Sequence, residues 1–385
     1  MTALRSVAIV GGGPSGATCA RRLAQAGAGV TLFEARPSSE KPCGGGVPAA
    51  ALDEFPELAS PDLPRRVVHH VVIHSPAGRS VPVPLDDGRH AREGIHIFRR
   101  VELDSFLRAQ AAAAGAVVIR AKVSAVRQGS DGGWELETSE GPAGPFEHLI
   151  GADGVHSVVR RSLTSAPRLD RDLTLALYAY LPGVPRGEMV LKFFAEMDGY
   201  FWIFPRADHL SVGICATRSS RSAGDLEAAL RTFVEQHCPG ITMTNVPLKG
   251  YFIPARKEIT IGPDGSWALV GDAGGQVDPI TREGIAWAMR SGLEAARNLL
   301  RTGQAATPTL PSNLAWAHRY GAGFYRKEFL ESMALLSRGS ASIRSVLADL
   351  LSGHQGYKRL RRRLLLKALP CGAQMFLTVL RAGIP

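Results

Sequence analysis

Residues 7–36 read VAIVGGGPSGATCARRLAQAGAGVTLFEAR, and they carry the clearest structural signal in the chain. The apolar run Val7–Val10 predicts a short strand, residues 14–26 predict a helix, and Val30–Phe33 predicts a second strand. A strand, a glycine-rich turn, a helix and a second strand followed by an acidic residue together form a nucleotide-binding βαβ unit. The unit predicts a bound dinucleotide and does not by itself separate FAD from NAD.

The turn of this unit contains glycines in the pattern G-x-G-x-x-G. Gly11 permits the tight turn, Gly13 lets the backbone approach a pyrophosphate, and Gly16 lets the helix pack close to the sheet. The helix N-terminus offers unpaired N–H groups to the phosphates, and Glu34 is placed to accept hydrogen bonds from ribose hydroxyls. The residues expected to contact the cofactor here are Gly11, Gly13, Pro14, Ser15, Gly16, Glu34, Ala35 and Arg36.

The composition is that of a globular protein large enough for two or three subdomains, with 385 residues and 45% hydrophobic content. The N-terminus leads directly into a strand, so we expect no signal segment. No apolar run reaches the roughly 18–20 residues that span a bilayer. The five cysteines are scattered without a C-x-x-C pair, which argues against a disulfide framework or a zinc site, and we predict no metal. These features predict a cytoplasmic protein.

The formal net charge of +10 has several explanations. No nucleic-acid-binding module accompanies the charge, so we expect no nucleic-acid partner. Phosphorylated cofactors, anionic substrates, a membrane surface or simply a basic surface would each account for it. The run YKRLRRRLLLKAL at residues 357–369 is open to two interpretations. It is either a peripheral contact with the inner face of a membrane or a basic helix end on the protein surface.

Two later segments indicate which dinucleotide is bound. Residues 151–160 read GADGVHSVVR, and residues 266–274 read SWALVGDAG, which predicts a strand ending at Gly271 and Asp272. Asp272 is placed to hydrogen-bond a ribityl or ribose hydroxyl, and a helix is expected at residues 284–300. Together with the glycine-rich turn, this three-part pattern resembles FAD-containing oxidoreductases of the p-hydroxybenzoate hydroxylase fold.

Three further segments are similar to the geranylgeranyl reductase family within that fold. They are KPCGGGVP at residues 41–48, FRRVELDSFLR at residues 98–108, and GYFWIFP at residues 199–205 followed by Val212 and Gly213. Their order and spacing fit the family over roughly residues 5–300. The resemblance implies bound FAD and reduction of isolated C=C bonds in polyprenyl chains on chlorophyll precursors, archaeal lipids or quinones.

The chain departs from the family at Arg282. The family usually has Gly-Glu-Gly after its Gly-Asp motif, whereas this chain has Thr281-Arg282-Glu283-Gly284. By resemblance, the replaced glycine lies close to the flavin. The Arg282 side chain therefore strains the loop, places its guanidinium near the flavin ring, or points to solvent or a phosphate. We expect the last of these, and the departure weakens the prediction of a standard isoprenoid substrate.

The predicted fold class is α/β, with a Rossmann-type FAD-binding domain, an inserted antiparallel β-sheet domain for the substrate and a C-terminal helical region. Alternating residues at 173–180 predict one strand of the inserted sheet, and Gly129–Gly133 and Gly141–Pro145 predict hairpin loops. The predicted boundaries are residues 1–64, 99–170 and 257–305 for the discontinuous FAD-binding domain, 65–98 and 171–256 for the substrate domain, and 306–385 for the helical region.

Cys43 is the first candidate for a catalytic side chain. By resemblance, its glycine-rich loop approaches the substrate side of the flavin, where a thiol would donate the proton that complements hydride delivery to an alkene carbon. The alternative for Cys43 is a small buried hydrophobe. Tyr200 and Trp202 share one strand face and either wall an apolar pocket or belong to the ordinary core.

Arg100 follows a strand and precedes a helix, and by resemblance it contacts FAD; otherwise it forms a surface salt bridge. The remaining cofactor contacts that the resemblance implies are Cys43, Gly44, Arg100, Val123, Asp153, Gly154, Gly271, Asp272, Gly284 and Ile285.

Three functions remain open from these residues. The first is a prenyl reductase whose FAD receives electrons from NADPH or another donor, bound transiently because the chain has no second G-x-G-x-x-G. The second is a flavin-dependent monooxygenase or halogenase-like enzyme that acts on an apolar or aromatic molecule through a flavin hydroperoxide. The third is a protein in which FAD has no redox role. The KPCGG segment and the aromatic strand favour the reductase, which would act on an apolar, isoprenoid or lipid substrate.

Overall fold

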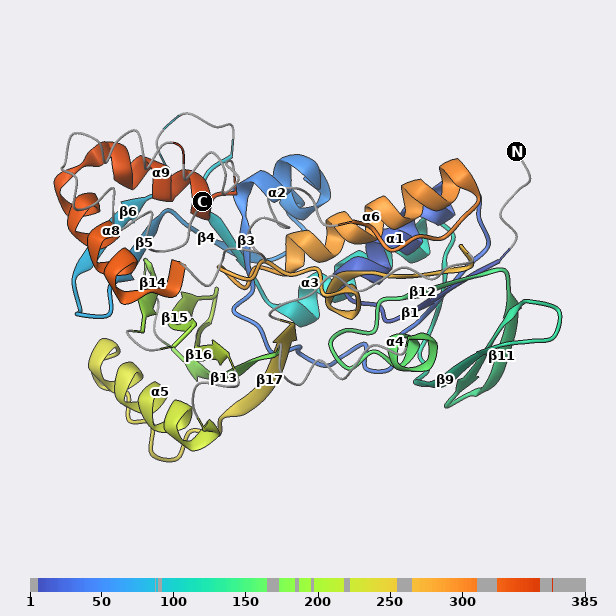
Figure 1. The fold of residues 1–385 in the computed structure, drawn as a ribbon, viewed down its shortest axis with the longest axis horizontal. Coiled ribbons are helices and arrows are strands. Elements are labelled where there is room, and N and C mark those ends of the chain that lie inside the picture. The colour runs from blue at the N-terminus through green and yellow to red at the C-terminus, as the bar shows by residue number, and fades with distance from the viewer. Residues whose placement is uncertain are drawn as a thin grey trace.

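The computed structural model describes residues 6–353 apart from residues 87, 89–91, 165–172, 184–186, 195–196, 218–221, 255–264 and 310–323, and beyond residue 353 only residue 362. Within these residues a parallel sheet covered by helices lies beside a larger mixed sheet, and helices from the C-terminal part lie at the far end of the mixed sheet (Figure 1). The predicted basic helix at residues 357–369 lies outside the described residues, except for residue 362.

The predicted nucleotide-binding unit is confirmed. Strand β1 (Val7–Val10) pairs in parallel with β2 (Val30–Phe33), and helix α1 (Pro14–Gln25) connects them. The full sheet has the order β18-β12-β1-β2-β8, and its other strands are β18 (Trp267–Leu269), β12 (His148–Gly151) and β8 (Val117–Ile119). All four residues of β1 are buried, because both faces of the sheet are covered.

The two faces of the parallel sheet carry different layers. On one face Val7 and Ile9 pack with α1 and α6 (Ile285–Thr302), which confirms the helix predicted at residues 284–300. On the other face Ala8 and Val10 pack against α4 and a small antiparallel sheet. The elements of that second layer are α4 (Val158–Leu163), β9 (Val123–Gln128), β10 (Trp134–Thr138) and β11 (Gly141–Phe146).

One of the two predicted hairpin loops is wrong. Gly129–Gly133 does connect β9 and β10, but Gly141–Pro145 lies inside β11 and pairs with β10. Strand β11 is at the edge of its sheet, where a proline needs no partner for its missing N–H. The glycine and proline content therefore suggested a turn where the chain forms an edge strand.

The molecule has two bodies. The parallel sheet with its covering layers is the first, and a seven-stranded sheet with the order β17-β13-β16-β15-β14-β5-β6 forms the second. The strand predicted from alternation at residues 173–180 is part of β13 (Leu173–Pro182). The remaining strands are β17 (Lys249–Pro254), β16 (His209–Thr217), β15 (Gly199–Pro205), β14 (Met189–Phe193), β5 (His70–His74) and β6 (Ser80–Pro84).

Helix α5 (Ala223–His237) covers one face of this sheet. Its N-terminus has a complete capping box, in which Ser222 and Asp225 satisfy each other's backbone N–H groups. On the covered face Phe201 stacks on Phe233 with ring centroids 4.3 Å apart, a contact worth about 1 kcal/mol. The opposite face, which carries Tyr200 and Trp202, is therefore left for the interior between the two bodies.

Short elements join the two sheets. A three-stranded sheet has the order β3-β7-β4, and it leads into helix α3 (Arg100–Ala113), which packs beside α1. The elements of this junction are β3 (Gly46–Pro48), β4 (Arg65–Val68), β7 (Ile95–Phe98), helix α2 (Ala49–Glu54) and the 3₁₀ turn η1 (Pro56–Ala59).

The C-terminal part is helical where the structure describes it. Helices α8 (Lys327–Gly339) and α9 (Ala341–Leu351) pack against β6 at the end of the seven-stranded sheet (Figure 1). Tyr325, Ala334 and Ala348 from this part join the same apolar cluster as Tyr200 and Trp202. None of the helices that the structure describes is long and apolar enough to cross a bilayer.

Candidate functional site

A continuous cavity of about 1160 Å³ runs between the two bodies. At one end it is bounded by the glycine-rich turn after β1 and by Glu34 after β2. Its middle is lined by the segment around Cys43 and by β13, β15 and β16, and its far end by β6, α8 and α9. The cavity therefore joins the dinucleotide-binding turn to the uncovered face of the seven-stranded sheet.

Two of the three glycines of the turn have the packing roles that the motif predicts, and the third faces open space. A Cβ on Gly16 would come within 1.9 Å of the Gly11 carbonyl oxygen, so this glycine allows the helix to approach the turn closely. Gly11 has a φ of +103°, and a Cβ there would come within 2.4 Å of the Ala152 carbonyl oxygen. At Gly13 a Cβ would meet no atom within 4 Å, and this residue lines the cavity. The turn thus leaves open space where a pyrophosphate would approach the N-terminus of α1.

Glu34 is held in one orientation by the backbone. Its Oε2 accepts a hydrogen bond from the Gly12 N–H at 2.7 Å, and its Oε1 accepts one from the Arg36 N–H at 2.7 Å. The carboxylate therefore faces the cavity beside the glycine-rich turn, where ribose hydroxyls can donate to it. Buried Arg108 supports the same turn, because its guanidinium donates to the Gly12 carbonyl at 3.1 Å.

Asp153 lies in the loop that precedes α4. Its Oδ2 accepts from the Val158 N–H at 2.6 Å, so it satisfies one of the free amides of that helix. Burial raises the pKa of Asp153 above its ordinary value, in spite of these hydrogen bonds. Its other oxygen, Oδ1, is buried without a hydrogen-bond partner among the described residues. Arg160 connects this segment to the second one, since it donates to the Val155 carbonyl at 2.5 Å and to the Ala273 carbonyl at 3.1 Å.

Asp272 lies in the cavity wall and pairs with Lys41, two residues before Cys43, with Nζ and Oδ2 2.9 Å apart. Burial acts to lower the pKa of Lys41, but Asp272 and Tyr251 together outweigh it and the pKa is raised. Lys41 also lies over the Tyr251 ring, 5.1 Å from the ring centroid. Asp272 thus faces the cavity with a cationic neighbour that holds its side chain in place.

Almost all of the predicted cofactor contacts line this cavity. The residues that do so are Gly11, Gly13, Pro14, Ser15, Glu34, Ala35, Arg36, Cys43, Gly44, Arg100, Val123, Asp153, Gly154, Asp272, Gly284 and Ile285. Gly16 and Gly271 do not appear in the cavity wall. Gly271 instead lets the 3₁₀ turn η3 (Gly271–Gly274) approach α1, because a Cβ there would come within 2.7 Å of Ser15 Oγ.

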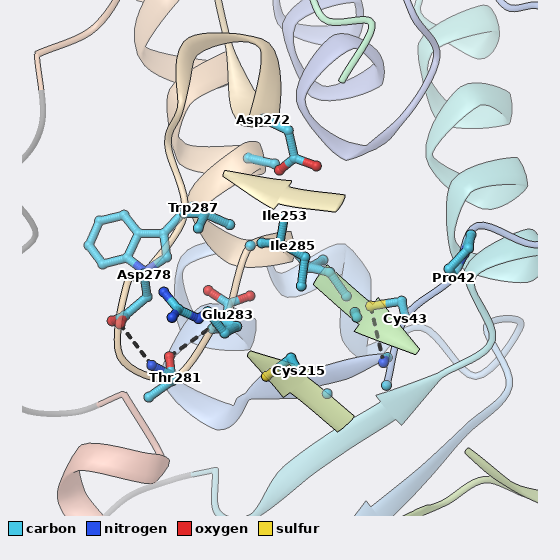
Figure 2. Close-up of a pocket in the computed structure, with 18 of the residues that line it drawn as sticks. Pro42, Cys43, Cys215, Ile253, Asp272, Asp278, Thr281, Glu283, Ile285 and Trp287 are labelled. Atoms are coloured by element: carbon cyan, nitrogen blue, oxygen red, sulfur yellow. Dashed lines mark hydrogen bonds between the residues drawn. The ribbon is translucent and has the colours of Figure 1, made fainter. Parts of the chain in front are cut away.

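The segment that carries Cys43 is wedged between two elements. A Cβ on Gly44 would come within 2.6 Å of the Phe204 ring, and Gly45 has a φ of +85° with its backbone against the Phe98 carbonyl oxygen. Cys43 is half-buried and accepts a hydrogen bond at Sγ from the Gly45 N–H at 3.3 Å. Figure 2 shows Cys43 reaching the cavity from a different element than Cys215 and Thr281. Three consecutive glycines therefore let the thiol reach the cavity wall.

Arg100 is buried, so the alternative of a surface salt bridge is wrong. It begins helix α3 and forms a bidentate pair with Asp104, with N–O distances of 2.9 and 2.8 Å. Burial acts to lower the pKa of Arg100, but Asp104 and the neighbouring Cys43 outweigh it and raise the pKa. A fixed positive charge therefore lies beside Cys43 in the cavity wall.

Tyr200 and Trp202 line the cavity from the same face of β15, as predicted. Their ring centroids are 6.4 Å apart, and the Trp202 indole N–H donates to Ser211 Oγ at 3.3 Å. The Tyr200 hydroxyl donates to the Thr281 carbonyl oxygen. Burial raises the pKa of Tyr200 well above its ordinary value, so its hydroxyl stays protonated at neutral pH. These rings form an apolar wall that is anchored by two polar groups.

Arg282 lines the cavity and does not point to solvent, so the solvent part of our expectation is wrong, while contact with a phosphate stays a prediction. It donates to the Pro279 carbonyl oxygen and lies over the Tyr325 ring at 5.7 Å from the centroid. Among the described residues it is the one non-glycine with a positive φ, of 57°, a conformation that strains an L-residue. Figure 2 shows the neighbouring Asp278, Thr281 and Glu283 around this loop, in which Asp278 Oδ1 accepts from the Thr281 N–H at 3.0 Å.

Known proteins resemble the chain in both sequence and structure. A family profile described as an FAD binding domain matches residues 5–219. A geranylgeranyl diphosphate reductase of Synechocystis sp. is 31% identical, over 84% of each chain. The chain belongs to the geranylgeranyl reductase family. It is therefore an FAD-dependent oxidoreductase.

One further relative agrees with this assignment, and one solved structure shares the fold. A digeranylgeranylglycerophospholipid reductase of Methanothrix thermoacetophila is 32% identical to the chain, over 75% of this chain and 76% of that one. A solved structure of a geranylgeranyl bacteriochlorophyll reductase-like protein from Thermoplasma acidophilum has a TM-score of 0.72 at 23% identity, and covers 93% of this chain and 98% of that one. The structural match shows a common fold.

The cavity fits an FAD molecule at its dinucleotide end. The open space at Gly13, the oriented carboxylate of Glu34 and the unpartnered Oδ1 of Asp153 are groups that phosphates, ribose and ribityl hydroxyls would satisfy. Asp272 adds a further acceptor next to Lys41. These residues would hold the dinucleotide part of the cofactor.

Sequence reasoning missed several residues of this site. Glu40 and Arg108 line its cavity, as do the apolar residues of α8 and α9 that close its far end, and buried Arg206 contacts Glu40. Arg108 is the last residue of the FRRVELDSFLR motif, and Arg206 directly follows the GYFWIFP motif, so the motifs could have pointed to both residues. Nothing in the local sequence shows that an arginine after a strand is buried, because its partners come from distant segments.

Proposed function

We propose that this family member reduces isolated C=C bonds of a polyprenyl, geranylgeranyl-type substrate. The observation that carries the proposal is the far part of the cavity, which is apolar and continuous with the FAD-binding end. It is lined there by Val81, Leu191, Phe193, Phe329, Leu330, Met333, Leu347, Leu350 and Leu351. A long hydrocarbon chain gains free energy on entering such a space, at about 25 cal/mol for each Å² removed from water.

The names of the relatives support the same substrate class. The Synechocystis relative is named for reduction of geranylgeranyl diphosphate, and the Methanothrix relative for reduction of a digeranylgeranyl glycerophospholipid. A chain with similar motifs and an apolar cavity is suited to substrates of this kind. NADPH or another reduced donor, bound transiently, would supply the electrons. Peripheral membrane contact through residues 357–369 belongs to the same proposal, because such substrates are drawn from a membrane or a carrier.

When bound, reduced FAD supplies the hydride for the double bond. The protein's own contribution is position, exclusion of water and the proton. Tyr200 and Trp202 form an apolar wall that keeps water from the reacting carbons. Cys43 Sγ carries the proton that completes the saturated C–C bond, and the sulfur then regains a proton from solvent. Arg100 beside Cys43 stabilises the thiolate that remains after proton transfer.

Product mass after incubation with a geranylgeranyl compound tests the proposal. The reduced holoenzyme is supplied with substrate in one tube without oxygen and in another with it. We expect an anaerobic gain of about two mass units for each double bond reduced. A gain of one oxygen atom that depends on oxygen, with no anaerobic product, would instead show a flavin-dependent monooxygenase.

Variants of two cysteines test the proton donor. Cys43→Ala should retain bound FAD and lose reductase activity, by a factor of about 10²–10⁴ if the thiol acts as a general acid. Cys238→Ala is the matched control, because Cys238 is buried among the residues under α5 and is not part of the cavity wall. Equal activity of the two variants would exclude Cys43 as the proton donor.

A further inference from the structure

Arg206 is a buried arginine next to the segment that carries Cys43. Its side chain is 1% exposed, and it pairs with Glu40, with Nη1 and Oε1 2.6 Å apart. It follows β15 directly, in the turn to β16, where its own N–H donates to the His209 carbonyl at 2.8 Å. A charged side chain buried to this degree is costly unless it is paired, so its partners indicate its role.

Glu40 joins this arginine to the FAD-binding body. Its carboxylate accepts from the Arg100 N–H at 3.0 Å and the Val101 N–H at 2.8 Å, at the N-terminus of α3. Negative charge is favoured there by the helix dipole and by unpaired amides. Burial acts to raise the pKa of Glu40, but Arg206 and these amides outweigh it and the pKa is lowered. The carboxylate is therefore ionised at neutral pH.

The other terminal nitrogen of the Arg206 guanidinium contacts the segment that carries Cys43. Arg206 Nη2 donates to the Cys43 carbonyl oxygen at 2.8 Å, and Ser211 Oγ lies 3.4 Å from the same oxygen. The guanidinium also lies over the Tyr180 ring, 4.7 Å from its centroid. The pair thus spans both ends of the segment 40–43, with Glu40 at one end and the Cys43 carbonyl at the other.

We propose that Arg206, acting with Glu40, is the positioning residue that holds Cys43 at the cavity wall. One planar guanidinium binds the carboxylate and the carbonyl with separate nitrogens while it stacks on Tyr180. The segment between them has no regular secondary structure, so contacts such as these, rather than a backbone ladder, hold the Cys43 end in place. The inference rests on the proposed function, because that function places Cys43 in the reaction.

A lysine cannot replace this arginine. An ammonium group on a flexible stem is a point charge without the fixed fork that reaches two acceptors at once. Arg206→Lys therefore keeps the charge balance of the buried pair but loses the bridge to Cys43. Glu40→Gln removes the charge partner from the other side with little change in volume. Both variants therefore disrupt the connection from Glu40 through Arg206 to the Cys43 carbonyl, one at Arg206 and the other at Glu40.

The test measures the reactivity of the Cys43 thiol in the FAD-bound protein. Iodoacetamide labelling is followed by mass spectrometry of the Cys43 peptide in the parent protein, Arg206→Lys and Glu40→Gln. We expect labelling of Cys43 to become at least threefold faster in both variants, since the segment is released. Cys19 serves as an internal reference, because burial raises the pKa of its thiol to about 12. Unchanged labelling of Cys43 in both variants would overturn the proposal.

A matched control separates positioning from general destabilisation. Arg65 also binds backbone carbonyls with its guanidinium, those of Ala59, Ser60 and Leu63, and is not part of the cavity wall. Arg65→Lys should leave the labelling rate of Cys43 unchanged. A similar rate increase in Arg65→Lys would show that loss of stability alone exposes the thiol, and it would refute a specific role for Arg206.

Steady-state kinetics give the second readout. In Arg206→Lys and Glu40→Gln, kcat for alkene reduction should fall at least tenfold while the substrate KM stays within about twofold, because positioning acts on the chemical step. The double variant should lose no more than either single variant, since both break the same bridge. A change in KM with kcat unchanged would overturn the proposal.

Failure of the two proposals can be told apart. If the parent protein shows no alkene reduction but the labelling of Cys43 still responds to Arg206→Lys, the proposed function is wrong and the positioning stands. If the parent protein reduces alkenes and neither labelling nor kcat responds, the positioning is wrong and the proposed function stands.

Discussion

The indole of Trp202 lies directly over Gly213 on the neighbouring strand. The two residues are cross-strand partners in β15 and β16, and a Cβ on Gly213 would come within 2.1 Å of Trp202 Cζ2. The Trp202 ring therefore occupies the space that a side chain at position 213 would fill. This relationship gives a physical reason for the glycine that follows the aromatic strand in the family pattern.

Gly213→Ala should displace the Trp202 ring and weaken the cavity wall. We expect a loss of about 1–3 kcal/mol in the free energy of unfolding, because the added methyl overpacks a buried site. Thermal denaturation and substrate KM would measure the two effects. Gly224→Ala is the control, since a Cβ there meets only Ser222 Oγ at 3.8 Å, in the first turn of α5. Equal stability of both variants would show that Trp202 moves without cost.

Gly13 and Gly16 should respond differently to alanine. At Gly13 the added methyl enters the open cavity, so we expect a folded protein with at least tenfold weaker FAD binding. At Gly16 the methyl would lie 1.9 Å from the Gly11 carbonyl oxygen, so we expect a loss of stability of about 1–3 kcal/mol. Titration of the FAD-free protein with FAD and thermal unfolding separate these outcomes. Normal FAD affinity in Gly13→Ala would contradict the pyrophosphate assignment.

His96 should make the protein less stable in mild acid. Burial, followed by the charge of Arg65, lowers the pKa of His96 to about 4, from about 6.5 in the unfolded chain. Between these values the unfolded chain binds the proton and the folded chain does not, so stability falls as the pH drops from 6.5 toward 4. The full effect is up to about 3 kcal/mol. His96→Leu should lack this loss in urea unfolding at pH 7 and pH 4.5.

Arg282→Gly should leave stability nearly unchanged. Glycine relieves the backbone strain at a φ of 57°, worth about 1 kcal/mol, while the contact with the Tyr325 ring is lost at a similar cost. The variant should also enlarge the cavity and favour bulkier substrates, which competition between two chain lengths would measure. Arg282→Lys is the control that keeps the strain. A loss well above 2 kcal/mol in Arg282→Gly would show that the guanidinium contacts outweigh the strain.

Much of the FAD-binding end could be predicted because its signals are local. The spacing of Gly11, Gly13 and Gly16 and the acidic Glu34 after a second strand specify one short unit, and the structure has it as expected. The strand of Tyr200 and Trp202 followed from a period of two. The prediction of a loop at Gly141–Pro145 was wrong because this segment pairs with β10 as an edge strand, and its glycine and proline content does not reveal that pairing.

The residues that close the far end of the cavity could not be predicted from local sequence signals. Helices α8 and α9 close it with residues whose spacing indicates an apolar face and says nothing of what that face covers. The direction of the Arg282 side chain likewise depends on Tyr325, which lies 43 residues further along the chain and packs beside it only in the folded protein.

The sequence by itself determined that this chain binds a dinucleotide and which family pattern it follows, because those signals lie within short segments. Only the tertiary structure decided that Arg206 meets Glu40 and the Cys43 carbonyl, across 166 and 163 residues of chain. Contacts of that range arise when separate elements pack together and a buried charge has to find its partners. The packing between the two bodies therefore assembles the surroundings of the thiol.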